Sequence, residues 1–155
     1  MKKNLVVLVA ILILLGAAGF GIMVGFTYNT TGYGAISIGT YTNDTTFIYA
    51  GLSFPLGMAA GGGMKIGDIY ATDLGTTTSG KKIGKLSISW GALGEVGADF
   101  TIYKTFGVFA GPALFFNWDS DFIEGKVMWY TSVGLAFSSL SGLYLDTTSG
   151  IFYRF

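Results

Sequence analysis

Hydrophobic and polar residues alternate one by one along most of this chain. Successive side chains of a β-strand point to opposite faces, so a period of two predicts strands that each have an apolar face. The clearest example is residues 143–155, whose odd positions include Leu145 and Ile151 and whose even positions include Asp146 and Arg154. One face of this segment suits an apolar environment, and the other carries charges of both signs.

The alternation predicts eight strands, separated by segments rich in turn-forming residues. We expect these strands at residues 33–41, 46–60, 64–74, 85–92, 95–103, 108–118, 127–138 and 143–155. The three glycines at 61–63 are interpreted as a turn or bend, and residues 92–94 as a short connection. Polar residues 75–82 are interpreted as a long exposed loop. No segment within these limits has a helical stripe, so the pattern predicts an all-β fold.

The composition is unusually apolar for a water-soluble domain. Hydrophobic residues make up 51% of the chain and charged residues only 12%, whereas ordinary globular proteins have about 25% charged residues. The net charge is zero and no basic patch with interleaved aromatic residues is present, which argues against nucleic acid as a partner. An apolar partner, such as a lipid bilayer, is expected to cover part of the surface.

The strands fit a transmembrane β-barrel better than a soluble β-sandwich. The outward face of a sandwich should carry charge, but both faces of several predicted strands are nearly free of it. Trp90, Trp118 and Trp129 lie near predicted strand ends, where interfacial aromatic residues of a membrane barrel are found. We therefore predict an up-and-down antiparallel transmembrane β-barrel.

The strand count contains a conflict, because residues 20–28 also alternate and would make a ninth strand. Single-chain bacterial barrels have even strand numbers. We therefore keep eight strands in a barrel domain at residues 33–155 and treat residues 19–32 as a leader or an extra strand. If residues 20–28 do belong to the sheet, we expect the error to lie within residues 51–74. Counting back from the last strand places loop 75–82 on the outside, opposite the C-terminus.

The amino-terminal residues show the three regions of a secretory signal peptide. Lys2 and Lys3 give a basic start, residues 5–15 form an aliphatic run, and residues 16–19 are small. We expect residues 1–18 to be a signal peptide cleaved near Ala18. The alternative is a retained membrane anchor helix that continues to about residue 26, since this stretch is long enough to span a bilayer. Either interpretation places the rest of the chain outside the cytoplasm.

The inward rows of such a barrel contain charges of both signs. The interior of an eight-stranded barrel is just wide enough to be filled by side chains, and enclosed opposite charges are expected to pair. We therefore predict an interior polar network that plugs the barrel, composed of Lys85, Glu95, Asp99, Asp146 and Arg154. A narrow polar conduit is the less favoured interpretation, because no ring of like charge is present.

The sequence offers little for catalysis or metal binding. It has no histidine and no cysteine, which removes the commonest catalytic base and the thiolate nucleophile together. We predict no enzyme activity, no cofactor and no metal site. Asp119, Asp121 and Glu124 share one predicted turn and could hold Ca²⁺ through oxygen atoms, but they lack a recognisable calcium-loop spacing.

The last residues carry a family resemblance. Phe155 ends the chain, with Tyr153 and Ile151 before it at two-residue spacing. This row resembles the C-terminal signature by which bacterial outer-membrane proteins are recognised for assembly, and the chain resembles small eight-stranded outer-membrane barrels. The resemblance implies location in the bacterial outer membrane, contact with the lipid bilayer and the assembly machinery, and a structural or surface-interaction role, as a homo-oligomer or in an envelope lattice.

Two other functions stay open at this point. The chain could be a β-rich subunit of an extracellular filament or surface layer, with residues 5–26 retained as an anchor helix. It could also be a narrow pore for small solutes, which is the lower-ranked alternative. Neither the fold class nor the C-terminal row identifies a ligand.

Overall fold

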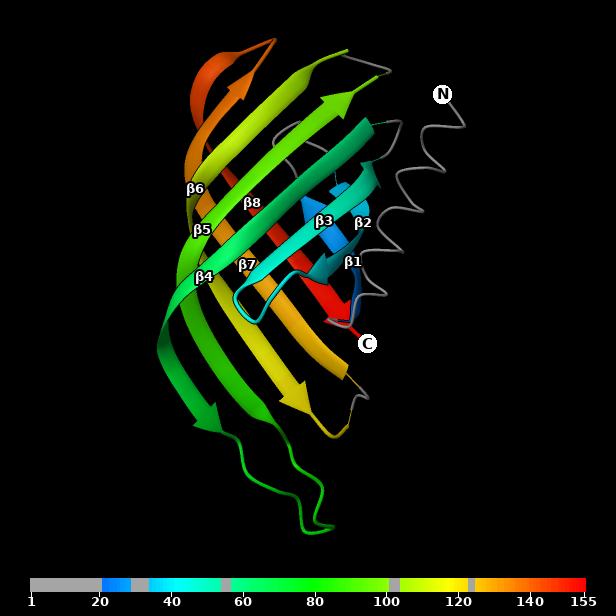
Figure 1. The fold of residues 1–155 in the computed structure, drawn as a ribbon, viewed down its shortest axis with the longest axis vertical. Coiled ribbons are helices and arrows are strands. Elements are labelled where there is room, and N and C mark those ends of the chain that lie inside the picture. Colours follow the sequence, from blue (N-terminus) through cyan, green and yellow to red (C-terminus); the bar gives the residue numbers. More distant parts are fainter. Residues whose placement is uncertain (1–20, 29–33, 54–56, 101–103, 123–124) are drawn as a thin grey trace.

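The computed structural model describes residues 21–28, 34–53, 57–100, 104–122 and 125–155, and these form one closed antiparallel β-barrel (Figure 1). The described strands follow one another around the barrel in chain order, and the first pairs with the last. They are β1 (Ile22–Tyr28), β2 (Gly34–Tyr41), β3 (Thr46–Ser53), β4 (Gly57–Asp73), β5 (Lys85–Asp99), β6 (Phe106–Ser120), β7 (Gly125–Ser138) and β8 (Gly142–Arg154). The predicted all-β, up-and-down barrel of eight strands is confirmed. Within these same residues, no helix is long and apolar enough to cross a membrane.

The barrel begins earlier than the predicted limit of 33–155. Strand β1 pairs with β2 on one side and with β8 on the other, where Phe26 lies opposite Ile151. Residues 22–28 are thus the extra strand considered for 19–32, and a helix reaching residue 26 is wrong for this segment. Without β1, the edges of β2 and β8 would be unpaired, which sheets generally avoid. Residues 1–20, including the predicted signal peptide, lie outside the described residues.

The count of eight is right, although the boundaries within β3, β4 and β5 are wrong. The predicted strands at 85–92 and 95–103 overlap a single strand, β5, whose pairing with β6 continues without a break through residues 92–94. The glycines at 61–63 lie within β4 rather than in a turn. The surplus strand came from the division of β5. The expected error within residues 51–74 is also present, because the predicted strand 46–60 combines β3 with the first residues of β4. In β4, Gly61 and Gly63 make room for the rings of Tyr49 and Phe47, a role that resembles a turn signal when only the sequence is read.

The longest connection of the described residues lies at the same end of the barrel as the start of β1 and the end of β8, which we call the terminal end (Figure 1). This connection, residues 74–84, joins β4 to β5 and contains an isolated bridge between Thr76 and Lys82. The predicted position of loop 75–82 at the opposite end is wrong. Counting β5 as two strands reversed the end of the barrel that was assigned to every connection before it.

The wall of the barrel is uneven in height. Strands β1 to β3 have seven or eight residues, whereas β4 to β8 have 13 to 17. Beyond Met64, β4 pairs with β5 but has no ladder partner in β3, and two bulges near Ile66 and Ile69 bend it. Bulges of this kind are typical of barrel rims. The terminal end is consequently enclosed by β4 to β8 more than by β1 to β3.

Charge is sorted strictly between the two faces of the wall. The outward rows carry large apolar side chains that are well exposed, such as Ile36, Val96, Leu135 and Leu145. The charged residues of the described strands all lie on the inward rows defined by the pairing register: Lys65, Asp68, Asp73, Lys85, Glu95, Asp99, Asp119, Lys126, Asp146 and Arg154. The outer surface of the strands is therefore free of formal charge.

Candidate functional site

The middle of the barrel is filled by five aromatic side chains, which we call the aromatic plug: Phe47, Tyr49, Phe115, Tyr130 and Phe152. Each of them is 2% exposed or less. Neighbouring rings of the plug lie with their centroids 5.3 to 6.3 Å apart, the range in which aromatic pairs attract. The rings come from β3, β6, β7 and β8, so the plug ties opposite walls of the barrel together.

Glycines on the inward rows create the space for these rings. A Cβ atom added to Gly61 would lie 2.6 Å from the Tyr49 hydroxyl oxygen, and one added to Gly150 would lie 2.5 Å from the Tyr130 ring. Both distances are too short for a real Cβ. The sequence thus places the smallest residue opposite the largest ones, which lets an eight-stranded barrel close around bulky rings.

The plug also contains a buried acid, Glu95. Its Oε2 atom accepts hydrogen bonds from the hydroxyl of Tyr49 at 2.7 Å and from Oγ1 of Thr148 at 3.0 Å. The hydroxyl of Tyr130 donates in turn to that of Tyr49 at 2.8 Å. These bonds link four strands, β3, β5, β7 and β8, and they hold a polar group in an otherwise aromatic core.

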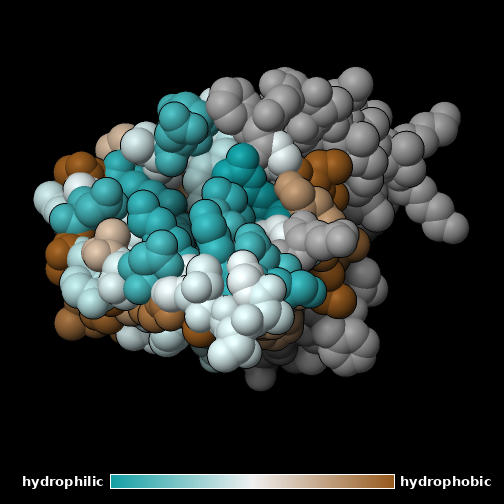
Figure 2. All heavy atoms as spheres, turned by 90° about the horizontal axis from the view of Figure 1, so that it is seen from below, coloured by the Kyte–Doolittle hydropathy of each residue, from teal (hydrophilic) through white to brown (hydrophobic). Residues whose placement is uncertain are grey.

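The terminal end contains a cavity of about 400 Å³ between the aromatic plug and the open rim. Seen from that end, hydrophilic residues gather in the middle and hydrophobic ones along the outer edge (Figure 2). The lining of the cavity combines four basic, three acidic and six uncharged residues: Tyr41, Asp44, Lys65, Asp68, Ala71, Lys85, Ser87, Asn117, Trp118, Asp119, Lys126, Met128 and Arg154. We call this space the terminal cavity.

A row of charges crosses the tall wall at this end. Directly paired positions on successive strands are Asp73, Lys85, Asp119, Lys126 and Arg154, in that order from β4 to β8. Asp119 and Lys126 form an ion pair of 2.8 Å, with both side chains about half exposed. An exposed pair of this kind contributes roughly 0–1 kcal/mol to stability, so its role in folding is small.

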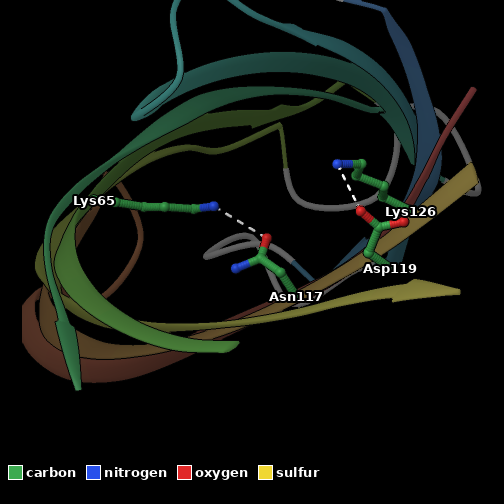
Figure 3. Close-up of polar contacts among 4 residues, drawn as sticks. All are labelled: Lys65, Asn117, Asp119 and Lys126. Atoms are coloured by element: carbon green, nitrogen blue, oxygen red, sulfur yellow. Dashed lines mark hydrogen bonds and ion pairs between the residues drawn. The ribbon is translucent and has the colours of Figure 1, made fainter. Parts of the chain in front are cut away.

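Lys65 on β4 and Arg154 on β8 reach into the terminal cavity from opposite walls. Nζ of Lys65 donates to Oδ1 of Asn117 at 3.0 Å, and Figure 3 shows these two side chains pointing toward one another inside the ring of strands. Lys65 and Arg154 both lie near the ring of Tyr41, with Nζ 5.4 Å and Cζ 4.8 Å from its centroid. Such contacts stabilise a cation without neutralising it.

The five residues of the predicted interior network all lie on inward rows, but they occupy three levels of the barrel. Lys85 and Arg154 line the terminal cavity, and Glu95 lies in the plug. Asp99 and Asp146 lie toward the opposite end, where Asp99 pairs with Gly57 and Asp146 pairs with Gly134. Of these five residues, Lys85 and Arg154 line the same cavity.

Sequence reasoning missed the polar residues that complete the terminal cavity, chiefly Lys65, Asp68, Asn117, Asp119 and Lys126. The signal was present for Asn117 and Asp119, which alternate with outward Phe116 and Trp118. It was hidden for Asp68, because the bulges in β4 shift the period of two.

The predicted surface aromatic residues lie on the outward rows. Trp90 and Trp129 are exposed, and the indole N–H of Trp118 donates to the carbonyl oxygen of Ile83 at 3.3 Å. Trp90 is the sixth residue of the 15-residue strand β5 rather than near a strand end. Ile151 and Phe155 are exposed on the outside, and the ring of Tyr153 packs edge-on against that of Phe155.

Two of the three acids considered for calcium, Asp119 and Asp121, have partners of their own. Asp119 pairs with Lys126, and Oδ2 of Asp121 accepts a hydrogen bond from the backbone N–H of Lys82. Glu124 lies outside the described residues. Within the described part of the chain, no group of three potential metal ligands is present.

Comparison with family models, with curated proteins and with solved structures gave no match to this chain. The function is therefore argued from the barrel's own surface, plug and cavity.

Proposed function

We propose that this protein is an integral β-barrel of the bacterial outer membrane, with a structural role and a closed interior. The observation that carries this proposal is the sorting of charge: every charged residue of the described strands is on an inward row. A lysine or arginine on the lipid face of a barrel costs about 2–4 kcal/mol at the bilayer midplane. The sequence avoids this cost throughout the described wall.

The apolar outer surface supports the same proposal. Side chains such as Ile36, Val133, Leu143 and Leu145 expose more than half of their surface around the barrel. A water-soluble monomer rarely exposes a continuous apolar area larger than a few hundred Å². Lipid tails would cover this belt without any change in the fold.

The aromatic plug supports a structural role over a pore. Its rings come from opposite walls of the barrel and are almost completely buried, so they block the axis at mid-height. Small barrels whose interiors are filled by side chains do not form channels. The exposed row of Ile151 and Phe155 is free to meet the assembly machinery, as the C-terminal resemblance implies.

Membrane extraction and gel migration test the proposal. The full chain should fractionate with outer membranes, resist extraction by carbonate, and migrate differently on a gel before and after boiling, because a closed barrel resists detergent denaturation. Recovery in sheared filaments, with no heat-dependent change in migration, would contradict the membrane proposal and favour the filament alternative. Steady single-channel currents in a planar bilayer would contradict the closed interior.

The orientation can be tested because the chain has no cysteine. In the proposed membrane, the C-terminal signature puts the terminal end on the periplasmic side, so the β4–β5 connection would face the periplasm. Ser79→Cys, in that connection, should stay unlabelled by an impermeant maleimide on intact cells, whereas Ser141→Cys, between β7 and β8, should be labelled. The opposite labelling pattern would invert the orientation.

A further inference from the structure

The terminal cavity holds its positive charges close together. Lys126 and Arg154 are directly paired positions on β7 and β8. Lys65 and Arg154 lie against the same ring, that of Tyr41, and Asp68 lines the same cavity. Like charges placed directly opposite one another destabilise a sheet. A cluster of this kind is tolerated more easily when an anion lies between its members.

Two of these cations keep unused hydrogen-bonding capacity. Among the described residues, neither Lys65 nor Arg154 has a carboxylate within salt-bridge distance, since the ion pair at this end joins Lys126 to Asp119. Lys65 is bonded to a neutral amide oxygen, and Arg154 lies against an aromatic ring. An ammonium group has three N–H donors and a guanidinium five, so most of them are left for a further acceptor.

Asn117 adds a neutral donor at the same place. Its Oδ1 atom faces Lys65, which fixes the orientation of the amide, and its buried Nδ2 atom has no hydrogen-bond partner among the described residues. A buried donor left without an acceptor costs roughly 1–3 kcal/mol. Because Asn117 lines the cavity, a bound anion that shifts this side chain slightly would supply the missing acceptor.

We propose that the terminal cavity is a binding site for a phosphate group. Lys65, Asn117 and Arg154 approach from three different strands, and a tetrahedral phosphate can accept from several directions whereas a planar carboxylate presents only two oxygen atoms. The guanidinium fork of Arg154 suits a phosphate in particular. The volume of about 400 Å³ leaves room for the molecule that carries the phosphate. This site does not depend on the membrane location of the barrel.

Calorimetric titration of the full chain tests the site. The protein is folded in a maltoside detergent at low salt and titrated with inorganic phosphate, with glycerol phosphate, and with short-chain dihexanoyl phosphatidylglycerol. Binding of the first two assigns the site to free phosphate compounds, and binding of the third alone assigns it to a lipid headgroup. Absence of binding in all three titrations would overturn the proposal.

Matched variants separate a specific site from general charge. Lys65→Gln and Arg154→Gln should each weaken binding by about tenfold, which corresponds to the loss of one charge-assisted hydrogen bond. Lys81→Gln removes the same charge from the exposed β4–β5 connection, outside the lining, and should leave the affinity unchanged. Equal weakening by all three variants would contradict the site.

Removal of a negative charge from the lining gives an independent check, because it leaves every proposed contact with the phosphate in place. Asp119→Asn deletes a carboxylate from the lining and releases Lys126, so it should strengthen binding several-fold. Folding of each variant is verified by heat-dependent gel migration, because Arg154 lies in the closing strand. Lys65→Gln tests the same site from β4, without a change in the closing strand. Weaker binding by folded Asp119→Asn would overturn the proposal.

Discussion

The middle and the terminal end of this barrel are built from the same strands and the same inward rows, yet their interiors differ. The middle holds rings that are matched by glycines on facing positions, as Gly150 is to Tyr130. The terminal end instead holds long charged side chains, such as Lys65 and Arg154, around a cavity of about 400 Å³. Side-chain volume and polarity along one row, rather than strand number alone, decide whether a small barrel is filled or hollow.

The height of the wall strengthens this difference. All of the described strands surround the aromatic plug, whereas the terminal end extends beyond β3 and is enclosed mainly by β4 to β8. A partly enclosed end admits water, which lowers the cost of charge there. We therefore expect substitutions in the plug to change mainly stability, and substitutions around the cavity to change mainly binding.

The largest expected effect is the loss of a ring from the plug. Phe47→Ala removes a fully buried side chain that packs against four aromatic neighbours, and large-to-small changes of this kind cost about 3–5 kcal/mol. Guanidinium unfolding in detergent, monitored by heat-dependent gel migration, should show this loss of stability. Phe122→Ala, at an exposed ring beyond β6, is the control and should change stability by less than about 1 kcal/mol. Equal effects of the two variants would contradict the plug.

Addition of a single methyl group to the plug should have the next largest effect. Gly150→Ala places a Cβ 2.5 Å from the Tyr130 ring, so the ring must move, and such overpacking costs about 1–3 kcal/mol. Gly94→Ala makes the same change on the outward row of β5, where the nearest atom within 4 Å of the new Cβ lies at 3.8 Å. Guanidinium unfolding of the two variants provides the measurement. A destabilised Gly94→Ala with an unchanged Gly150→Ala would mean that the inward and outward rows are reversed.

These glycines also explain what the sequence alone could predict. The period of two was enough to predict an all-β barrel with inward Glu95 and Arg154, because one strongly apolar row recurs in most strands. It failed at residues 61–63, where Gly61 and Gly63 make room for rings inside a strand, and at residues 92–94, where Gly94 lies on the open outward row of a continuous strand. Nothing local separates a glycine inside a strand from one in a turn, since the ring that needs the space at Gly61 belongs to the neighbouring strand β3.

The candidate site was harder to predict than the fold. The alternation of odd and even positions is enough to identify inward residues such as Lys85. The height of each residue along the barrel axis depends on the register between strands. The division of β5 removed that register, so Lys85, Glu95 and Asp99 seemed to belong to one network. The cation–π contacts of Tyr41 and the bond between Lys65 and Asn117 depend on pairs 24 to 113 residues apart, which no local pattern reveals.

The smallest expected effect on stability is at the rim of the terminal cavity. Lys126→Met removes the ion pair with Asp119, whose members are both about half exposed, so the free energy of unfolding should fall by less than about 1 kcal/mol. The difference from the unaltered chain should shrink further in 0.5 M salt, because screening weakens exposed pairs. Guanidinium is itself a salt, so urea unfolding is the appropriate measurement. A loss as large as that of Phe47→Ala would mean that the terminal end is packed as tightly as the middle, and that the charges around the cavity are structural rather than available to a ligand.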